Sequence, residues 1–175
     1  MSPPACAGGL LLKEEAMKVP SFTVNHDKML RGVYVSRVDQ IGNEYVTTFD
    51  IRMKVPNREP VLGNPEIHTL EHLFAVYLRG ESGAWAEEIV YIGPMGCRTG
   101  MYLIVKGGKR SEEIIEPLKA MFMYVMNFTG AVPATTSPEC GNYLDHNLEF
   151  AKWEARRFYN EVLKDITAEN MVYPD

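Results

Sequence analysis

The residues best suited to chemistry lie in the short segment His68-Thr69-Leu70-Glu71-His72. If this segment is helical, positions i and i+4 share a face, so both imidazoles are able to reach one metal ion. Glu71 is rotated away from the two imidazoles, a placement that suits proton transfer better than metal ligation. A pair of surface histidines is the alternative interpretation, but the flanking residues are apolar. The spacing therefore predicts a divalent metal held between His68 and His72.

A third ligand is expected, because catalytic metal sites usually have three protein ligands and one open position. Cys140 lies in a loop with proline and glycine, just before the last expected helix, where a thiolate is able to point inward. A buried, inert cysteine is an equally open interpretation of this residue by itself. The H-x-x-E-H pattern also occurs in inverzincin metallopeptidases, in which a downstream glutamate, here Glu149, supplies the third ligand. The shortness of the chain disfavours a peptidase.

Cys97 lies between Gly96 and Arg98, in a loop that joins two expected strands. Small neighbours allow the backbone to approach a substrate closely, and a nearby arginine or metal lowers the pKa of a thiol. A packed thiol in a turn is the alternative, but the glycines and the proline of this loop favour a functional role. A metallopeptidase would have no use for such a loop.

The composition excludes several classes of partner. The chain has 175 residues and a net charge of -5 without a long basic run, so we expect neither a nucleic acid nor an acidic membrane surface as partner. No apolar run approaches the roughly 20 residues of a membrane-spanning helix, and the N-terminus lacks the features of a secretory signal. We therefore expect a cytoplasmic protein. In a reducing compartment an odd set of cysteines, Cys6, Cys97 and Cys140, indicates ligands or reactive thiols rather than disulfides.

The elements that must position these residues follow from the periodicity of the sequence. Strands at 33–38 and 45–53, joined by a turn at 40–43, predict a hairpin. A helix is expected from Asn64, as N-cap, to a stop near Gly80. The remaining elements are strands at 88–92 and 101–105, a helix at 111–128 capped by Ser111, and a helix at 145–166. This order predicts a single α+β domain at 18–175, preceded by an extension at 1–17 that is rich in proline, alanine and glycine.

Three segments together resemble one family closely, the S-ribosylhomocysteine lyase (LuxS) family. They are H-T-L-E-H at 68–72, G-P-M-G-C-R-T-G at 93–100 and E-C-G-N at 139–142. They occur in the family's order and at about its spacing, and two weaker matches lie at 20–26 and 49–52. The resemblance covers about residues 18 to 166. The three segments are very specific together, whereas any one of them alone is not.

The resemblance implies a two-layer α+β sandwich with an antiparallel sheet, and a homodimer whose active sites lie at the subunit interface. It implies one divalent metal per subunit, held by His68, His72 and Cys140, natively Fe(II) and replaceable by Zn(II) or Co(II). It implies cleavage of the thioether of a small molecule, S-ribosylhomocysteine, to homocysteine and 4,5-dihydroxy-2,3-pentanedione. The second product is the precursor of autoinducer-2, a quorum-sensing signal.

The implied reaction accounts for the residues. A thioether carbon–sulfur bond breaks readily only when a carbonyl lies β to the sulfur, so the sugar carbonyl must first migrate through enediolates that a Lewis-acid metal stabilises. Protons must leave and return at carbon, which suits Glu71 and Cys97 as thiolate. The resemblance also assigns sugar binding to Ser21, His26 and Arg52.

The chain departs from the family pattern in two places. Tyr91 stands where many members have aspartate, and residues 1–16 have no counterpart, so that Met17 is the expected start of the shared domain. A metal- or thiol-based sensor that keeps the fold but has no catalytic activity is a third hypothesis beside the lyase and the peptidase.

Overall fold

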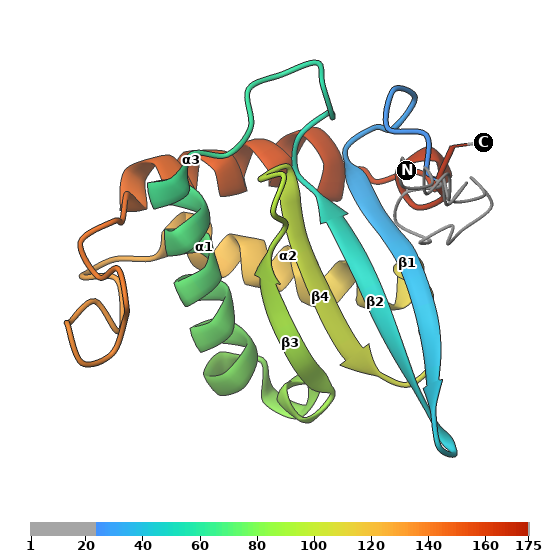
Figure 1. The fold of residues 1–175 in the computed structure, drawn as a ribbon, viewed down its shortest axis with the longest axis horizontal. Helices are drawn as coiled ribbons and strands as arrows, with labels where there is room; N and C mark the ends of the chain where they lie inside the picture. The colour runs from blue at the N-terminus through green and yellow to red at the C-terminus, as the bar shows by residue number, and fades with distance from the viewer. Residues whose placement is uncertain (1–23, 175) are drawn as a thin grey trace, which may run out of the picture.

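The computed structural model of the chain describes residues 24–174 (Figure 1). The elements are, in order, β1 (Gly32–Ile41), β2 (Glu44–Arg52), α1 (Asn64–Val76), β3 (Ile89–Pro94), β4 (Gly100–Lys106), α2 (Ser111–Asn127) and α3 (Leu148–Phe158). Short π-helical turns, Tyr77–Glu81 and Tyr159–Leu163, extend α1 and α3. The predicted order of elements is confirmed. The expected domain boundary after residue 17, together with Cys6 and Ser21, lies outside the described residues.

The four strands form one antiparallel sheet in the order β1-β2-β4-β3. β1 and β2 pair as the predicted hairpin, and a bulge separates Val35 from Arg37. Figure 1 shows α2 and α3 crossing one face of the sheet, while α1 stands beside β3. The predicted two-layer α+β sandwich is therefore confirmed. None of the described helices combines the length and apolar character needed to cross a membrane.

The hydrophobic core lies between the sheet and the helices. Ile51 of β2 is fully buried there, and Phe74 of α1 packs against Phe122 of α2 with ring centroids 5.0 Å apart. Successive side chains of a strand point to opposite faces, so the neighbours of Ile51 point away from the core. These neighbours are Asp50 and Arg52. The alternation that fills the core therefore also places an acid and a base side by side on the other face of the sheet. We call this face, which α2 and α3 do not cover, the open face.

The caps predicted for α1 and α2 were wrong. Gly63, not Asn64, is the N-cap of α1, and the Asn64 side chain instead accepts a hydrogen bond from Arg98 Nη1 at 3.1 Å. Ser111 is the first helical residue of α2, and its hydroxyl donates to the carbonyl oxygen of Met171 at 3.4 Å. In both cases the side chain that the local sequence pattern assigned to the cap forms a hydrogen bond with a distant segment instead.

The last helix begins later than predicted. The sequence placed its start near residue 145, whereas α3 begins at Leu148. The physical reason is an N-cap at Asn147, whose side-chain oxygen accepts the backbone N–H of Phe150 at 3.1 Å. The residues before the cap thereby stay in an irregular loop, and this loop lies beside α1.

Ion pairs tie the loop between β2 and α1 to the rest of the fold. Glu59 binds Arg31 and Arg157, each with an N–O distance of 2.8 Å. Burial alone would raise the pKa of Glu59, but the hydrogen bond from Arg31 and the charges of both arginines lower it to about 2. Lys54 and Glu154 form a second pair that is almost completely buried. Because α1 follows this loop, these contacts help to fix where α1 begins.

Candidate metal centre and active site

Helix α1 places His68 and His72 on one face, with ring centroids 4.7 Å apart. His68 Nδ1 lies 3.0 Å from the carbonyl oxygen of Asp145, and His72 Nδ1 lies 2.8 Å from that of Pro133. A carbonyl oxygen only accepts, so each Nδ1 carries the proton and each Nε2 presents a lone pair. This outer contact is the one that metal-binding histidines typically make.

Cys140 joins the two histidines from the loop that precedes α3. Its Sγ lies 3.3 Å from His68 Nε2 and accepts the backbone N–H of Asn142 at 3.4 Å. The backbone N–H of Cys140 donates to the carbonyl oxygen of Thr136 at 3.1 Å, which fixes the turn that carries the thiol. The structure thus brings together the three residues that the sequence singled out as a ligand set.

A fourth donor, His146, was not anticipated from the sequence. Its ring stacks on His68, with centroids 4.1 Å apart, and its Nδ1 lies 3.2 Å from Thr69 Oγ1. The Thr69 hydroxyl donates its own proton to the Pro65 carbonyl, so Nδ1 of His146 must be the donor. The lone pair of Nε2 is then buried with no partner among the described residues. The position of His146 in the same loop as Cys140 is the signal that could have found it.

The cluster fits a divalent metal. The donor atoms of His68, His72, Cys140 and His146 all lie within 4.8 Å of one another. Burial and the nearby imidazoles lower the pKa of His146, which keeps its ring neutral and able to donate a lone pair. Nitrogen and thiolate sulfur are the ligands that borderline ions such as Fe(II), Co(II) and Zn(II) accept. Glu149, the third ligand in the peptidase hypothesis, is exposed on α3 and does not belong to this cluster.

Glu71 lies beside the metal cluster at the edge of a cavity. A hollow of about 390 Å³ is lined by Glu71 and His68 on one side and by Gly96 and Arg98 of the β3–β4 loop on the other. A smaller hollow of about 230 Å³ has Glu71 and His72 in its wall. The carboxylate therefore faces space that a small molecule is able to enter, which is the placement predicted for a proton carrier.

Cys97 belongs to a different cluster, on the open face of the sheet. Its Sγ lies 3.0 Å from Thr99 Oγ1 and 3.8 Å from Arg52 Nη1. Arg52 Nη1 also donates to Thr99 Oγ1 at 2.5 Å, so the guanidinium contacts both the hydroxyl and the sulfur. Burial opposes ionisation of Cys97, but the contacts with Thr99 and Arg52 outweigh it and lower the pKa of the thiol. The lowered thiol pKa expected from the sequence is confirmed in direction.

The arginine responsible is not the one that the sequence suggested. Arg98, the chain neighbour of Cys97, points its guanidinium to Asn64 on α1. Its backbone has a φ of 58°, in the left-handed region that residues other than glycine rarely adopt. This turn sends the side chains of Cys97 and Arg98 to different neighbours. The loop thus connects the cavity beside Glu71 with the cluster around Arg52.

Two further residues from the sequence analysis lie on or near the open face. His26 is half-buried, with its Nδ1 2.9 Å from the Val24 carbonyl oxygen, and its charge acts on the carboxyl group of Asp50. It therefore shares a neighbourhood with Arg52, as a joint role in binding would require. Tyr91 lines a hollow of about 250 Å³ together with Tyr102. Two aromatic side chains therefore meet at the position of Tyr91, the departure from the family pattern that the sequence showed.

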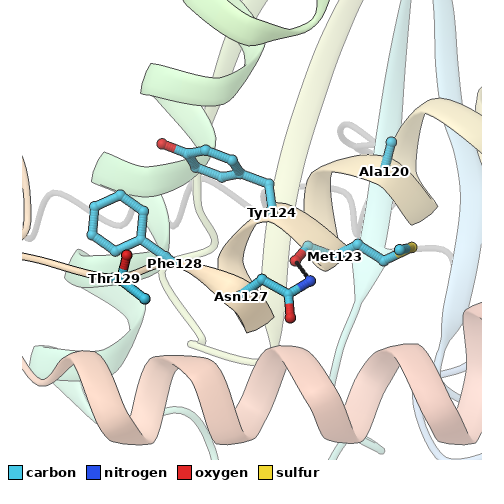
Figure 2. Close-up of a pocket in the computed structure, with 6 residues that line it drawn as sticks. All are labelled: Ala120, Met123, Tyr124, Asn127, Phe128 and Thr129. Atoms are coloured by element: carbon cyan, nitrogen blue, oxygen red, sulfur yellow. Dashed lines mark hydrogen bonds between the residues drawn. The ribbon is translucent and has the colours of Figure 1, made fainter.

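The hollow in Figure 2 is not a candidate for the chemistry. It lies at the C-terminal end of α2 and has a volume of about 360 Å³. Its lining is Ala120, Met123, Tyr124, Asn127, Phe128 and Thr129. The hydrogen bond drawn there joins Asn127 to the carbonyl oxygen of Met123 within the helix. No carboxylate, imidazole or thiol lines it.

Known proteins match most of the chain. A family model described as S-Ribosylhomocysteinase (LuxS) matches residues 19–169, which include the metal cluster and Cys97. The chain is 53% identical over 156 residues to an S-ribosylhomocysteine lyase of Phocaeicola vulgatus, covering 89% of this chain and 96% of that protein. It is 52% identical over 158 residues to the S-ribosylhomocysteine lyase of Porphyromonas gingivalis, covering 90% and 99%. The corresponding protein of Finegoldia magna is 46% identical over 158 residues, with the same coverage. The chain therefore belongs to the S-ribosylhomocysteinase (LuxS) family.

Proposed function

We propose that this chain is a carbon–sulfur lyase that cleaves S-ribosylhomocysteine to homocysteine and 4,5-dihydroxy-2,3-pentanedione. The observation that carries the proposal is the cluster of His68, His72 and Cys140 at the edge of a cavity that also contains Glu71. The cluster offers lone pairs to a metal, and the cavity offers a carboxylate to a substrate. Both features lie within the part of the chain that matches the family.

The substrate dictates what the site must do. In the open-chain sugar the carbonyl is at C1, and the sulfur is attached to C5. Two proton shifts move the carbonyl from C1 to C2 and then to C3, each by removal of a proton from the next carbon and its return to the previous one. Loss of the C4 proton then expels the thiolate of homocysteine from C5. A metal in the cluster would supply a Lewis acid for the oxygens of the sugar.

Cys97 and Glu71 are the proposed proton carriers. The contacts with Thr99 and Arg52 lower the pKa of the Cys97 thiol, which favours the thiolate form that a catalytic base requires. Glu71 faces the cavity from the side of the metal cluster. Arg52 and His26 are proposed to hold the sugar, and Arg52 also stabilises the Cys97 thiolate. Ser21 is proposed for the same role from the resemblance of its segment to the family.

The chain is proposed to act as a homodimer with its active sites at the subunit interface. The described helices cover one face of the sheet, whereas Tyr91, Tyr102 and Ile104 remain partly exposed around a hollow on the other face. Cys97 and Arg52 lie on that open face. Pairing of two open faces would bury the aromatic side chains and bring the cluster around Cys97 to the subunit boundary.

Three finer features complete the proposal. The resident metal is proposed to be Fe(II), which the nitrogen and sulfur donors accept. The catalytic domain is proposed to start near residue 18, because the family match begins at residue 19. The protein is proposed to work in the cytoplasm, where Cys97 and Cys140 stay reduced.

A product assay with synthetic S-ribosylhomocysteine tests the function. The Fe(II)-loaded chain is expected to release homocysteine, detected as free thiol and by mass, and the His72→Ala variant is expected to release none. Cleavage of generic peptides in place of thiol release would support the peptidase. Bound metal with neither product would support the sensor. Either of the last two results would overturn the proposed reaction.

A further inference from the structure

The C-terminal segment crosses the start of β1, close to the open face of the sheet. Asn170 Nδ2 donates to the Arg31 carbonyl oxygen at 2.8 Å, and the Ser111 hydroxyl reaches the Met171 carbonyl oxygen. The approach depends on Gly32, because a Cβ at that position would lie 2.1 Å from the Asn170 carbonyl oxygen. The family match ends at residue 169, so the last part of this segment lies beyond it.

Tyr173 anchors the end of this segment on the sheet. Its ring stacks on Tyr34 of β1, with centroids 4.8 Å apart and an interplanar angle of 15°. Its hydroxyl donates to Asp50 Oδ2 at 2.9 Å, although Asp50 itself is only 1% exposed. The Tyr34 hydroxyl makes a different bond, to the Leu30 carbonyl oxygen at 3.1 Å. Only one of the two stacked tyrosines therefore donates to the buried carboxylate.

Asp50 connects Tyr173 to the cluster around Cys97 through Arg52. Arg52 Nη2 donates to Asp50 Oδ2 at 2.5 Å, the same oxygen that Tyr173 binds. Arg52 Nη1 then reaches Thr99 and Cys97. The other Asp50 oxygen and Nε of Arg52 are buried without a hydrogen-bond partner among the described residues. Among the described residues, few contacts fix the geometry of the pair, and the bond from the Tyr173 hydroxyl is one of them.

We propose that Tyr173 is a positioning residue for Cys97. Its hydroxyl fixes the orientation of the Asp50 carboxylate, and this carboxylate in turn holds Arg52 against the Cys97 thiol. The inference deepens the proposed function, since it rests on Cys97 as a proton carrier. Without the Tyr173 hydroxyl, the Asp50 carboxylate loses a donor and is free to rotate, and Arg52 follows it away from the sulfur. The Asp50 charge, less compensated, also disfavours a nearby thiolate. Both effects raise the pKa of the Cys97 thiol.

The titratable groups around this contact do not replace it. Burial and the charge of Asp50 raise the pKa of Tyr173, so its hydroxyl stays protonated and remains a donor at every working pH. Tyr102 on β4 faces both Asp50 and Cys97, and burial raises its pKa as well, so it adds no charge at neutral pH. His26 acts on Asp50 through its charge. A change at Tyr173 leaves all these groups in place.

The test compares Tyr173→Phe with Tyr34→Phe in the full-length, metal-loaded protein. Both variants keep the stacked rings, and each loses one hydroxyl, but only Tyr173→Phe loses a bond to Asp50. The rate of iodoacetamide modification of Cys97, followed by peptide mass spectrometry across pH, gives the thiol pKa of Cys97 alone. The turnover number, KM and melting temperature are measured on the same samples.

Tyr173→Phe is expected to raise the Cys97 pKa by about half to one unit, which lowers the thiolate fraction at neutral pH about 3- to 10-fold. The turnover number should fall by a similar factor, with KM and melting temperature little changed, and Tyr34→Phe should alter none of these values. An unchanged Cys97 pKa in Tyr173→Phe, or an equal rise in Tyr34→Phe, would overturn the proposal. If the pKa shifts but wild-type protein releases no homocysteine, the positioning stands and the lyase assignment fails.

Discussion

The two cysteines of the candidate site are held in contrasting surroundings. Cys140 sits among imidazoles whose Nδ1 protons are bound by outer oxygens, so that lone pairs converge on one point. Cys97 sits against the guanidinium of Arg52 and the backbone N–H of Thr99, which are donors toward the sulfur. Converging lone pairs repel one another unless a cation lies between them, whereas converging donors stabilise an anion. One thiol is thus arranged to bind a metal and the other to carry a proton.

The clusters also differ in where they lie. The metal cluster comes from α1 and from the loop that precedes α3, and its donors lie within a single subunit. The Cys97 cluster comes from β2 and the β3–β4 loop and lies on the face of the sheet that no described helix covers. If the chain forms the proposed homodimer, a change to the metal cluster should act within one subunit, and the Cys97 cluster should depend on the second subunit.

The largest effect is expected from Cys140→Ala. Removal of the thiolate takes away the negatively charged donor, so most of the bound metal and essentially all activity should be lost together. Metal content by inductively coupled plasma mass spectrometry and homocysteine release are the two readouts. Glu149→Ala is the matched control, because Glu149 is exposed and should leave both values unchanged. Loss of metal from Glu149→Ala with retention in Cys140→Ala would reverse the ligand assignment and favour the peptidase.

Cys97→Ser and Glu71→Gln should separate proton transfer from metal binding. Each is expected to keep full metal content and a normal fold, but to lose turnover by about 10² to 10⁴-fold, the usual contribution of a positioned acid or base. Cys97→Ser should be the more severe, because a serine hydroxyl stays protonated at neutral pH. In the wild-type protein, modification of Cys97 should rise with pH around a midpoint below that of an ordinary thiol.

Two outcomes would contradict this division of roles. Near wild-type turnover in Cys97→Ser would make Cys97 a packing residue. Purification of Cys97→Ser without metal would make it a ligand in place of Cys140, and the contrast between the two thiols would then disappear.

The proposed dependence of the Cys97 cluster on a second subunit is tested at Ile104. Ile104→Asp places a charge on the open face of the sheet, beside the aromatic hollow, and should convert a dimer into monomers. Activity is expected to fall at least tenfold while metal content stays full, because the metal cluster needs only one subunit. Light scattering, metal content and homocysteine release are measured in parallel.

Met123→Asp is the control for Ile104→Asp. Met123 is also partly exposed, but it lines the hollow of Figure 2, on α2, and α2 packs against the other face of the sheet (Figure 1). The Met123→Asp variant should have the same oligomeric state and activity as the wild-type protein. A fully active monomer of Ile104→Asp would show that both clusters work within one subunit.

The smallest effect is expected from removal of residues 1–16. A chain that starts at Met17 should match the full-length protein in activity, metal content and melting temperature, since the removed residues show no core-forming pattern. Neither the metal cluster nor the Cys97 cluster would then need the extension for its function. A fall of several degrees in melting temperature would reveal packing against the domain. Loss of activity alone would place part of the extension at the substrate.

The sequence by itself determined the local part of this protein. His68 and His72 are four residues apart on one helix, so helical geometry alone allows both imidazoles to reach one metal ion. Apolar and polar residues alternate in β1 and β2, and this alternation predicts the strands. The order of strands and helices then predicts the α+β sandwich, because the periods of strands and helices are properties of neighbouring residues. Cys140 was separated from other candidates by its resemblance to a family motif.

The tertiary structure decided everything that depends on distant pairs. His146 became a candidate donor because Thr69, on another element, fixes its tautomer. Arg52 rather than Arg98 faces Cys97, because a left-handed turn sends the two side chains of the loop apart. Tyr173 reaches Asp50 across more than a hundred residues of chain. Periodicity reports which face a residue occupies, but only the packing of whole elements determines which side chains meet on it.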